Sequence, residues 1–225
     1  ITIVEVRTMC LFKKLIILLG VLLLILSGYI VFNPHTFMND ASINNGWNLI
    51  LVDHTNRIPA HYQTTLQKLN NGKEVDSRIV PSLSEMFIDA RKDNVYMQVN
   101  EGYRSKEMQQ KILDERVAHY KSKGLITILA KRYALNYVAA PLTSEHELGL
   151  AVDLIGDHRY TTNQSAYHWL HENAYKYGFI ERYPIDKTTM TNMKYEPWHY
   201  RYVGKKAALN MHQSNYCLEE YIDSL

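Results

Sequence analysis

The sequence has 225 residues and a formal net charge of +2, from 25 lysines and arginines against 23 aspartates and glutamates. Because basic and acidic residues are interspersed, no basic face for nucleic acid is predicted. The length beyond the N-terminal region suits one domain with its own core, and a second globular domain would be crowded. The two cysteines, Cys10 and Cys217, stand near opposite ends of the chain, so no intrachain disulfide is expected.

An apolar segment near the N-terminus predicts a membrane anchor. Residues 15–32, LIILLGVLLLILSGYIVF, carry no formal charge and are long enough to span a bilayer. Arg7, Lys13 and Lys14 precede this segment. Basic residues on that flank favour a cytoplasmic N-terminus over residues 1–14 and place the C-terminal domain on the extracytoplasmic face of the plasma membrane, after a single pass.

Two kinds of cleavable signal compete with this interpretation. A lipoprotein signal is excluded because the sequence LSGY, residues 26–29, contains no cysteine. A signal peptide could end at the small residues Ser27 and Gly28, but the apolar run continues through Phe32, past the end of a short signal core. An uncleaved signal anchor is therefore expected, with signal cleavage as the alternative.

Beyond the anchor, residues 33–46 form a polar, turn-rich linker, and the folded domain is expected over residues 47–225. Apolar periodicity and flanking residues predict helices at residues 81–92, 105–123, 125–138 and 167–178. Short apolar or alternating runs predict strands at residues 48–53, 95–100, 149–155 and 199–204. Because helices and strands mix without a regular βαβ rhythm, the fold is predicted to be α+β, a single compact domain with a small antiparallel sheet flanked by helices.

Three residues form a candidate metal site. The stretch SEHELGLAVDL at residues 144–154 holds His146 and Asp153 seven positions apart, and EPWHYRYVG at residues 196–204 adds His199. A hydrolytic zinc ion usually has three such protein ligands and one open position for water. The small residues Gly149 and Ala151 would let the backbone pass close to the metal.

Glu196, three residues before His199, is positioned to act on water rather than as a ligand. Zinc lowers the pKa of its bound water to about 7, so a neighbouring carboxylate can take the proton during attack and return it to a leaving amine. The chain has ten histidines, and most are expected to be packed or surface residues. His168 and His171 share a helix face but lack a suitable third ligand, so both are interpreted as structural. Spacing alone leaves metal binding open.

Several segments resemble one family of peptidases. The motif S-x-H-x-x-G-x-A-x-D, here SEHELGLAVD, and EPWHYR are similar to those of the VanY-type zinc D-alanyl-D-alanine carboxypeptidases, relatives of the VanX-type dipeptidases. GYRS at residues 102–105, followed by Gln109, and GFIERYP at residues 178–184 also look like that family. The resemblance extends from about Trp47 to Gly204 in consistent order.

The resemblance implies one Zn²⁺ per chain on His146, Asp153 and His199, with Glu196 as the catalytic base. It also implies that Arg104 faces the site and stabilises an oxyanion or binds the substrate carboxylate, where a planar, permanent positive charge suits developing negative charge. A surface ion pair is the alternative for Arg104.

Four further residues are expected around the substrate. Ser144 and Gln109 are expected to help hold the carboxylate of the terminal D-alanine. Tyr103 and Trp198 are expected either to line the pocket or to pack structurally.

The sequence departs from the family pattern at a few positions. The family often has serine where this chain has Glu101, Pro-Gly where it has Pro141-Leu142, and Gln-Thr where it has Glu147-Leu148. None of these changes removes a proposed metal ligand or the base, although they affect the shape of the pocket.

The resemblance therefore implies a zinc metallopeptidase, a membrane-anchored D,D-carboxypeptidase. It would remove the terminal D-alanine from peptidoglycan precursor peptides ending in D-Ala-D-Ala, outside a bacterial plasma membrane, and so contribute to glycopeptide (vancomycin) resistance. The alternatives are an L,D-carboxypeptidase or a D-Ala-D-Ala dipeptidase on the same scaffold. A non-catalytic cell-wall-binding module is the alternative of another class.

Overall fold

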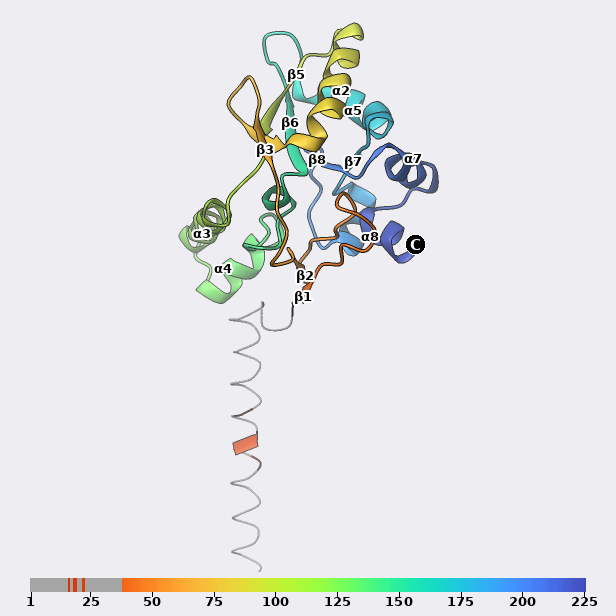
Figure 1. The fold of residues 1–225 in the computed structure, drawn as a ribbon. Coiled ribbons are helices and arrows are strands. Elements are labelled where there is room, and N and C mark those ends of the chain that lie inside the picture. Colours follow the sequence, from red (N-terminus) through yellow and green to blue (C-terminus); the bar gives the residue numbers. More distant parts are fainter. Residues whose placement is uncertain (1–15, 17, 20–21, 23–37) are drawn as a thin grey trace, which may run out of the picture. The chain divides into compact units, whose positions relative to one another are not determined.

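A computed structural model describes Ile16, Leu18, Leu19, Leu22 and residues 38–225, and the fold lies in one compact unit, Asn39–Leu225 (Figure 1). The predicted membrane segment at residues 15–32 falls almost entirely outside the described residues. Among those that are described, no helix has the length and apolar character needed to cross a membrane. The compact unit begins earlier than the predicted boundary at Trp47, because residues 39–40 already form a strand and Ala41 is buried.

A four-stranded sheet lies at the centre of the unit. Its strands are β5 (Met97–Glu101), β6 (Ala151–Gly156), β8 (His199–Tyr202) and β7 (Phe179–Glu181), hydrogen-bonded in that order. Every neighbouring pair is antiparallel. The predicted α+β class with a small antiparallel sheet is therefore confirmed.

Two smaller strand pairs lie outside this sheet. β3 (Leu66–Lys68) and β4 (Glu74–Asp76) are antiparallel, whereas β1 (Asn39–Asp40) and β2 (Asn56–Arg57) are parallel. The start of β4 contacts the segment that follows β5, since the Glu74 carbonyl accepts a hydrogen bond from the Tyr103 backbone N–H (2.6 Å). The hairpin of β3 and β4 was not predicted.

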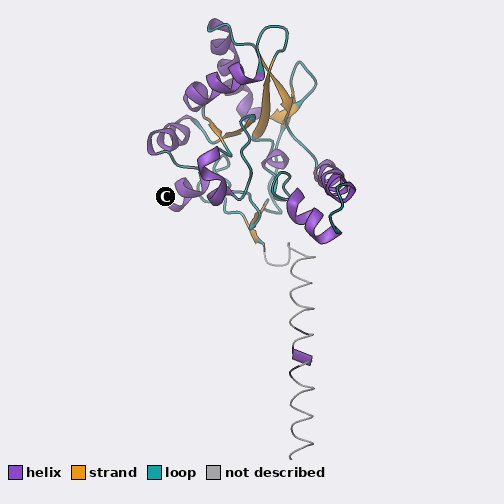
Figure 2. Ribbon diagram, turned by 180° about the vertical axis from the view of Figure 1, so that it is seen from behind, coloured by secondary structure: helices purple, strands orange, loops and turns teal. Residues whose placement is uncertain are grey.

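Helices flank the sheet (Figure 2). The α-helices are α2 (Val80–Lys92), α3 (Lys106–Ser122), α4 (Thr127–Ala134), α5 (Asn163–Asn173), α6 (Thr188–Thr191), α7 (Lys205–Ser214) and α8 (Leu218–Asp223). Short 3-10 helices are η2 (Ser77–Ile79), η3 (Glu145–Leu148), η4 (Ala174–Tyr177) and η5 (Ile185–Lys187). In both overall views α3 and α4 form a pair set apart from α2, α5 and α7 (Figures 1 and 2).

The largest apolar core lies between the sheet and helices α2 and α5. Its buried residues include Leu83 and Met86 from α2, Leu154 from β6 and Leu170 from α5. A second cluster packs α7 and α8 near Ile180, and a third lies between α3 and α4.

Most predicted elements are present with shifted ends. The helix predicted at residues 81–92 is α2, with its proline in the first turn, and the helix predicted at 105–123 is α3, capped by the Ser105 hydroxyl and followed by Gly124. The helix predicted at 125–138 is shorter, α4. The helix predicted at 167–178 begins earlier, as α5, because the Thr162 hydroxyl caps it at the Ser165 backbone N–H (3.1 Å).

One predicted strand was wrong. Residues 48–53 are not a strand, although Ile50 and Val52 are buried. Their carbonyl groups are occupied by a side chain instead, because Arg201 donates to the carbonyls of Asn48 (3.2 Å) and Ile50 (2.9 Å).

Gly156 offers a test of the packing at the end of β6. A Cβ at this position would lie 2.7 Å from the Thr162 carbonyl oxygen and still closer to that of Thr161, both backbone atoms. We expect Gly156→Ala to lower the free energy of unfolding by about 1–3 kcal/mol, as overpacking typically does, in urea unfolding followed by circular dichroism. Gly156 does not have a positive φ, so backbone strain of that kind does not contribute to the expected loss. An unchanged free energy of unfolding in Gly156→Ala would contradict the packing argument.

Candidate metal centre and active site

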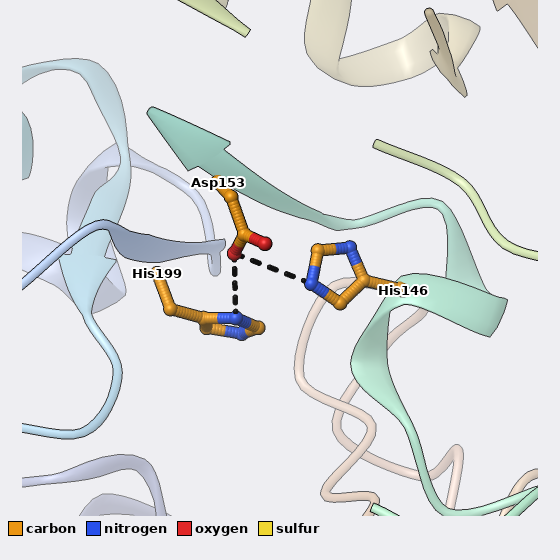
Figure 3. A group of neighbouring side chains, drawn as sticks. All are labelled: His146, Asp153 and His199. Atoms are coloured by element: carbon orange, nitrogen blue, oxygen red, sulfur yellow. Dashed lines mark hydrogen bonds and ion pairs between the residues drawn. The ribbon is translucent and has the colours of Figure 1, made fainter. Parts of the chain in front are cut away.

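The three predicted metal ligands converge on one point. One ligand atom from each of His146, Asp153 and His199 lies within 4.8 Å of the other two, and all three residues are buried. Asp153 Oδ1 lies 3.4 Å from His146 Nε2 and 3.1 Å from His199 Nδ1 (Figure 3). Among the residues that the structure describes, this is the one group of three or more such side chains placed to hold a metal ion.

Sheet register and a tight turn produce this convergence. Asp153 on β6 stands directly opposite His199 on β8 in the antiparallel pair, so both side chains emerge on the same face. His146 comes from η3, which ends at Gly149 in the left-handed conformation, with φ +74°. A Cβ on Gly149 would lie 3.0 Å from the Asp76 backbone nitrogen, so this position favours glycine for both conformation and space.

A backbone carbonyl sets the orientation of His146. Its Nδ1 lies 2.7 Å from the carbonyl oxygen of Gly102, which can only accept. His146 Nδ1 therefore carries the proton and donates, which leaves the lone pair of Nε2 free for a metal ion. Gly102 packs so closely against β4 that a Cβ at this position would clash with the Glu74 carbonyl oxygen.

His199 is flanked by a buried carboxylate on its far side. Glu145 Oε2 lies 3.4 Å from His199 Nε2. Glu145 is fully buried and pairs with two buried arginines, Arg182 (2.7 Å) and Arg201 (3.0 Å). Burial alone would raise the pKa of Glu145, but the two guanidinium groups outweigh it and hold that pKa well below its ordinary value. Glu145 is thus a buried anion behind the metal ligands.

Glu196 lies beside the ligands without joining them. Its Oε2 is 3.8 Å from His199 Nδ1 and its side chain is 10% exposed. The turn that carries it is fixed by backbone hydrogen bonds, from Glu196 to Tyr183 and from His199 to Glu196 (both 3.1 Å). Burial raises the pKa of Glu196 to about 7, although the nearby His199 acts in the opposite direction. A carboxylate with such a pKa can both accept and return a proton near neutral pH.

Arg104 faces the metal ligands. Its Nη2 lies 3.2 Å from Asp153 Oδ2, its Nη1 lies 3.3 Å from Gln109 Oε1, and its side chain is 16% exposed. Arg104 is thus mostly buried, and its ion pair with Asp153 lies beside the metal ligands. Within the described residues, the buried Nε of Arg104 makes no hydrogen bond but lies 3.9 Å from Glu101 Oε2. Each terminal nitrogen carries two N–H groups, so the guanidinium retains donor capacity for an anion.

The other predicted substrate residues lie at different depths. Gln109 is buried with both ends of its amide engaged, by Arg104 and by the Ala139 carbonyl (2.7 Å), so it positions Arg104. Ser144 is buried at the start of η3, Tyr103 is half-buried, and Trp198 is 38% exposed. Direct contact of these residues with substrate stays a prediction.

Two departures from the family pattern contact each other. The backbone N–H of Leu142 donates to Glu147 Oε1 (2.8 Å), and Leu142 has a φ of +68°, a conformation that favours glycine. The Glu147 carboxylate thus stabilises the strained turn just before the His146 segment. Burial raises the pKa of Glu147 to about 7.

Sequence reasoning missed the supporting residues: Gly102 as an acceptor, Glu145, Arg182 and Arg201. All four lie within the motifs quoted for the family resemblance, and Glu145, Arg182 and Arg201 are charged residues close to the proposed ligands or within the predicted strands and their flanks. That pattern was the available signal, because a charge buried in a core has to be paired.

The donor set fits zinc. Two imidazole nitrogens and one carboxylate oxygen are the ligands of many catalytic zinc sites, and such sites keep a further position open. The hydrogen bond from His146 to the Gly102 carbonyl is the kind of support that histidine ligands of metals usually have.

Comparisons with known proteins agree with this geometry. The sequence model of the VanY family, described as D-alanyl-D-alanine carboxypeptidase, matches residues 72–205. A D-alanyl-D-alanine carboxypeptidase of Enterococcus faecalis is 51% identical over 178 residues, which cover 79% of this chain and 66% of that protein. The chain thus spans just under two thirds of that relative's length.

Solved structures are similar over most of the compact unit. VanYB in complex with D-alanine-D-alanine superimposes with a TM-score of 0.78 at 51% identity, over 79% of this chain and 98% of that one. A zinc complex of a variant of the vancomycin resistance D,D-pentapeptidase VanY, from a VanB-type resistance cassette, gives a TM-score of 0.76 at 52% identity. That match covers 78% of this chain and 99% of the other.

Zinc binding can be tested through stability. A ligand that binds only the folded state at about one hundred times its dissociation constant adds about 2.7 kcal/mol to the free energy of unfolding. We expect zinc to raise the melting temperature of the full chain, a chelator to reverse the effect, and His146→Ala to abolish it. His168→Ala, which changes an exposed histidine, is the matched control and should respond like wild type. An equal zinc response in the His146 variant would contradict the site.

Proposed function

The chain belongs to the VanY family of D-alanyl-D-alanine carboxypeptidases, and on that basis we propose that it is a zinc-dependent D,D-carboxypeptidase. Its substrates are peptidoglycan precursor peptides ending in D-Ala-D-Ala, from which it releases the terminal D-alanine. The observation that carries this proposal is the buried group of His146, Asp153 and His199, with Glu196 and Arg104 beside it.

The three ligands would hold one zinc ion through His146 Nε2, an Asp153 carboxylate oxygen and His199 Nδ1. A zinc ion there supplies Lewis acidity, which acidifies water and polarises a carbonyl group. The protein fixes the ligand atoms in advance, because the imidazole of His146 is hydrogen-bonded at its other nitrogen and Asp153 is held in the sheet.

Glu196 carries the proton in this reaction. Its carboxylate takes a proton from the attacking water as the new C–O bond forms at the scissile carbonyl. It then returns that proton to the amine nitrogen of D-alanine as the C–N bond breaks. Burial supports both halves of the transfer, since it raises the pKa of Glu196 to about 7 and keeps bulk water from competing for the proton.

Arg104 supplies fixed positive charge to the substrate. Asp153 and Gln109 hold its two terminal nitrogens, so the guanidinium plane cannot swing away to solvent. A donor fixed in this way stabilises an oxyanion or a carboxylate without reorganising during the reaction. Because Arg104 also contacts Asp153, a substrate anion bound by Arg104 would be one residue away from this metal ligand.

The membrane anchor remains part of the proposal. The apolar sequence at residues 15–32 and the basic residues before it support a single-pass anchor with the catalytic domain on the extracytoplasmic face. Such an anchor would hold the site near lipid-linked precursors and raise their effective concentration. Removal of terminal D-alanine in this place would contribute to glycopeptide resistance, in keeping with the VanB-type cassette from which the zinc-bound relative comes.

The related activities are separated by substrate choice. Rates with a pentapeptide ending in D-Ala-D-Ala, a tetrapeptide ending in L-Lys-D-Ala and free D-Ala-D-Ala distinguish D,D-carboxypeptidase, L,D-carboxypeptidase and dipeptidase. The proposal requires the pentapeptide to be preferred. A non-catalytic wall-binding module would need neither the buried Glu196 nor its raised pKa, and it would hydrolyse none of the three.

Replacement of the proposed base gives the first kinetic prediction. We expect Glu196→Gln to lower kcat by about a hundredfold to ten-thousandfold, because the amide cannot accept the proton, while zinc binding is retained. The measurement is D-alanine release from the pentapeptide by the full chain. Glu172→Gln changes an exposed carboxylate on α5 and should leave the rate unchanged. Near-wild-type release by the Glu196 variant would remove it from the mechanism.

Arg104 is tested by a substitution that keeps the charge. Arg104→Lys loses the planar guanidinium that contacts Asp153 and Gln109 together. We expect kcat/KM for the pentapeptide to fall about a hundredfold to a thousandfold, the usual cost of one oxyanion donor. Arg132→Lys on the exposed side of α4 is the control. An unchanged kcat/KM in Arg104→Lys would assign Arg104 a packing role.

A further inference from the structure

A line of buried charges connects the C-terminal helix α8 to the metal ligand His199. Glu219 on α8 makes two hydrogen bonds to Arg182, to Nη1 (2.9 Å) and Nη2 (2.8 Å). Arg182 Nε then donates to Glu145 Oε1 (2.7 Å), and Glu145 Oε2 reaches His199 Nε2 (3.4 Å). The side chains of Arg182 and Glu145 are 1% and 0% exposed, so water cannot substitute for these contacts.

The two oxygens of Glu145 have different partners. Oε1 is shared by Arg182 (2.7 Å) and Arg201 (3.0 Å), whereas Oε2 faces His199. A carboxylate oxygen only accepts, so this contact places the proton of His199 on Nε2 and turns the lone pair of Nδ1 toward Asp153 and the metal position. Glu145 thus selects which nitrogen of His199 can bind metal.

Glu219 determines how Arg182 meets Glu145. Glu219 accepts one hydrogen bond from each terminal nitrogen of Arg182, and this fixes the guanidinium with its Nε–H directed at Glu145. Without the Glu219 charge, the buried terminal nitrogens of Arg182 would need another anion, and Glu145 is within reach. A paired, two-bond contact of Arg182 with Glu145 would draw Oε2 away from His199.

We propose that Glu145 is a positioning residue for the metal ligand His199, and that Glu219, acting through Arg182, keeps Glu145 in that role. The C-terminal helix α8 (Leu218–Asp223) therefore helps to orient a metal ligand, although it lies outside residues 72–205, which match the family model. This inference rests on the proposed zinc site.

The test uses two neighbouring glutamates of the same helix. Glu219→Gln in the full chain removes the charge that holds Arg182. Glu220→Gln is the matched control, since Glu220 also supports α8, by accepting from the Cys217 backbone (2.8 Å) and pairing with Lys187 (2.9 Å), but has no contact with the charged line. Urea unfolding of the metal-free proteins measures the loss of stability in each variant.

Zinc affinity is measured by competition with a chromophoric chelator, and ligand geometry by the absorption spectrum of the cobalt(II)-substituted proteins. We expect Glu219→Gln to weaken zinc binding by about tenfold, the lower end of the effect of outer-shell changes, and to shift the cobalt spectrum. Glu220→Gln should change neither. Glu219→Asp keeps the charge on a shorter side chain and should recover part of the affinity.

Equal effects of the two glutamine variants on zinc affinity would overturn the proposal, because they would show that α8 only stabilises the fold. Unchanged affinity in Glu219→Gln would overturn it as well. If Glu219→Gln does not fold, Glu219→Asp and Glu220→Asp are compared in the same way, and only the former should weaken zinc binding. Since no peptide is used, failure of this inference is distinct from failure of the proposed peptidase activity.

Discussion

The pairing register of β6 with its two neighbours is the constraint on which the site depends. On one side, Asp153 stands opposite His199 of β8, and on the other, it stands opposite Glu101 at the end of β5. Strand β5 then leads directly into Gly102, whose carbonyl orients His146, and on to Arg104. A one-residue slip of either pair would turn side chains to the opposite face. A single row across the sheet therefore positions the ligands, their orienting carbonyl and the substrate-facing arginine.

Buried charge is concentrated around that row, and the charges are paired in layers. Asp153 lies between the histidines and Arg104, while behind His199 the carboxylate of Glu145 is compensated by two arginines. Burying any one of these groups unpaired would cost several kcal/mol. The largest apolar core lies elsewhere, mostly between the sheet and helices α2 and α5. The side chains that stabilise the fold by apolar packing are therefore largely separate from those of the candidate active site.

The sequence predicted those features of the structure that depend on residues close together in the chain. The stripe of Leu83, Met86 and Ala90 gave α2, and the motif residues gave the ligands and Glu196, because these signals lie within short stretches of sequence. The segment at residues 48–53 was wrong as a strand because its carbonyl partner is a side chain more than 150 residues away. Glu145 was missed for the same reason, since the partners that make its burial possible come from β8, from the segment after β7 and from α8.

The hydrogen bonds from Arg201 to the carbonyls of Asn48 and Ile50 indicate which residues the folded domain requires. The family match begins at residue 72 and ends at residue 205, whereas Ile50 and Val52 at one end and Leu218 at the other belong to the buried core. The stretch that matches the family is therefore shorter than the stretch that forms the buried core, and residues on both sides of the match contribute side chains to that core.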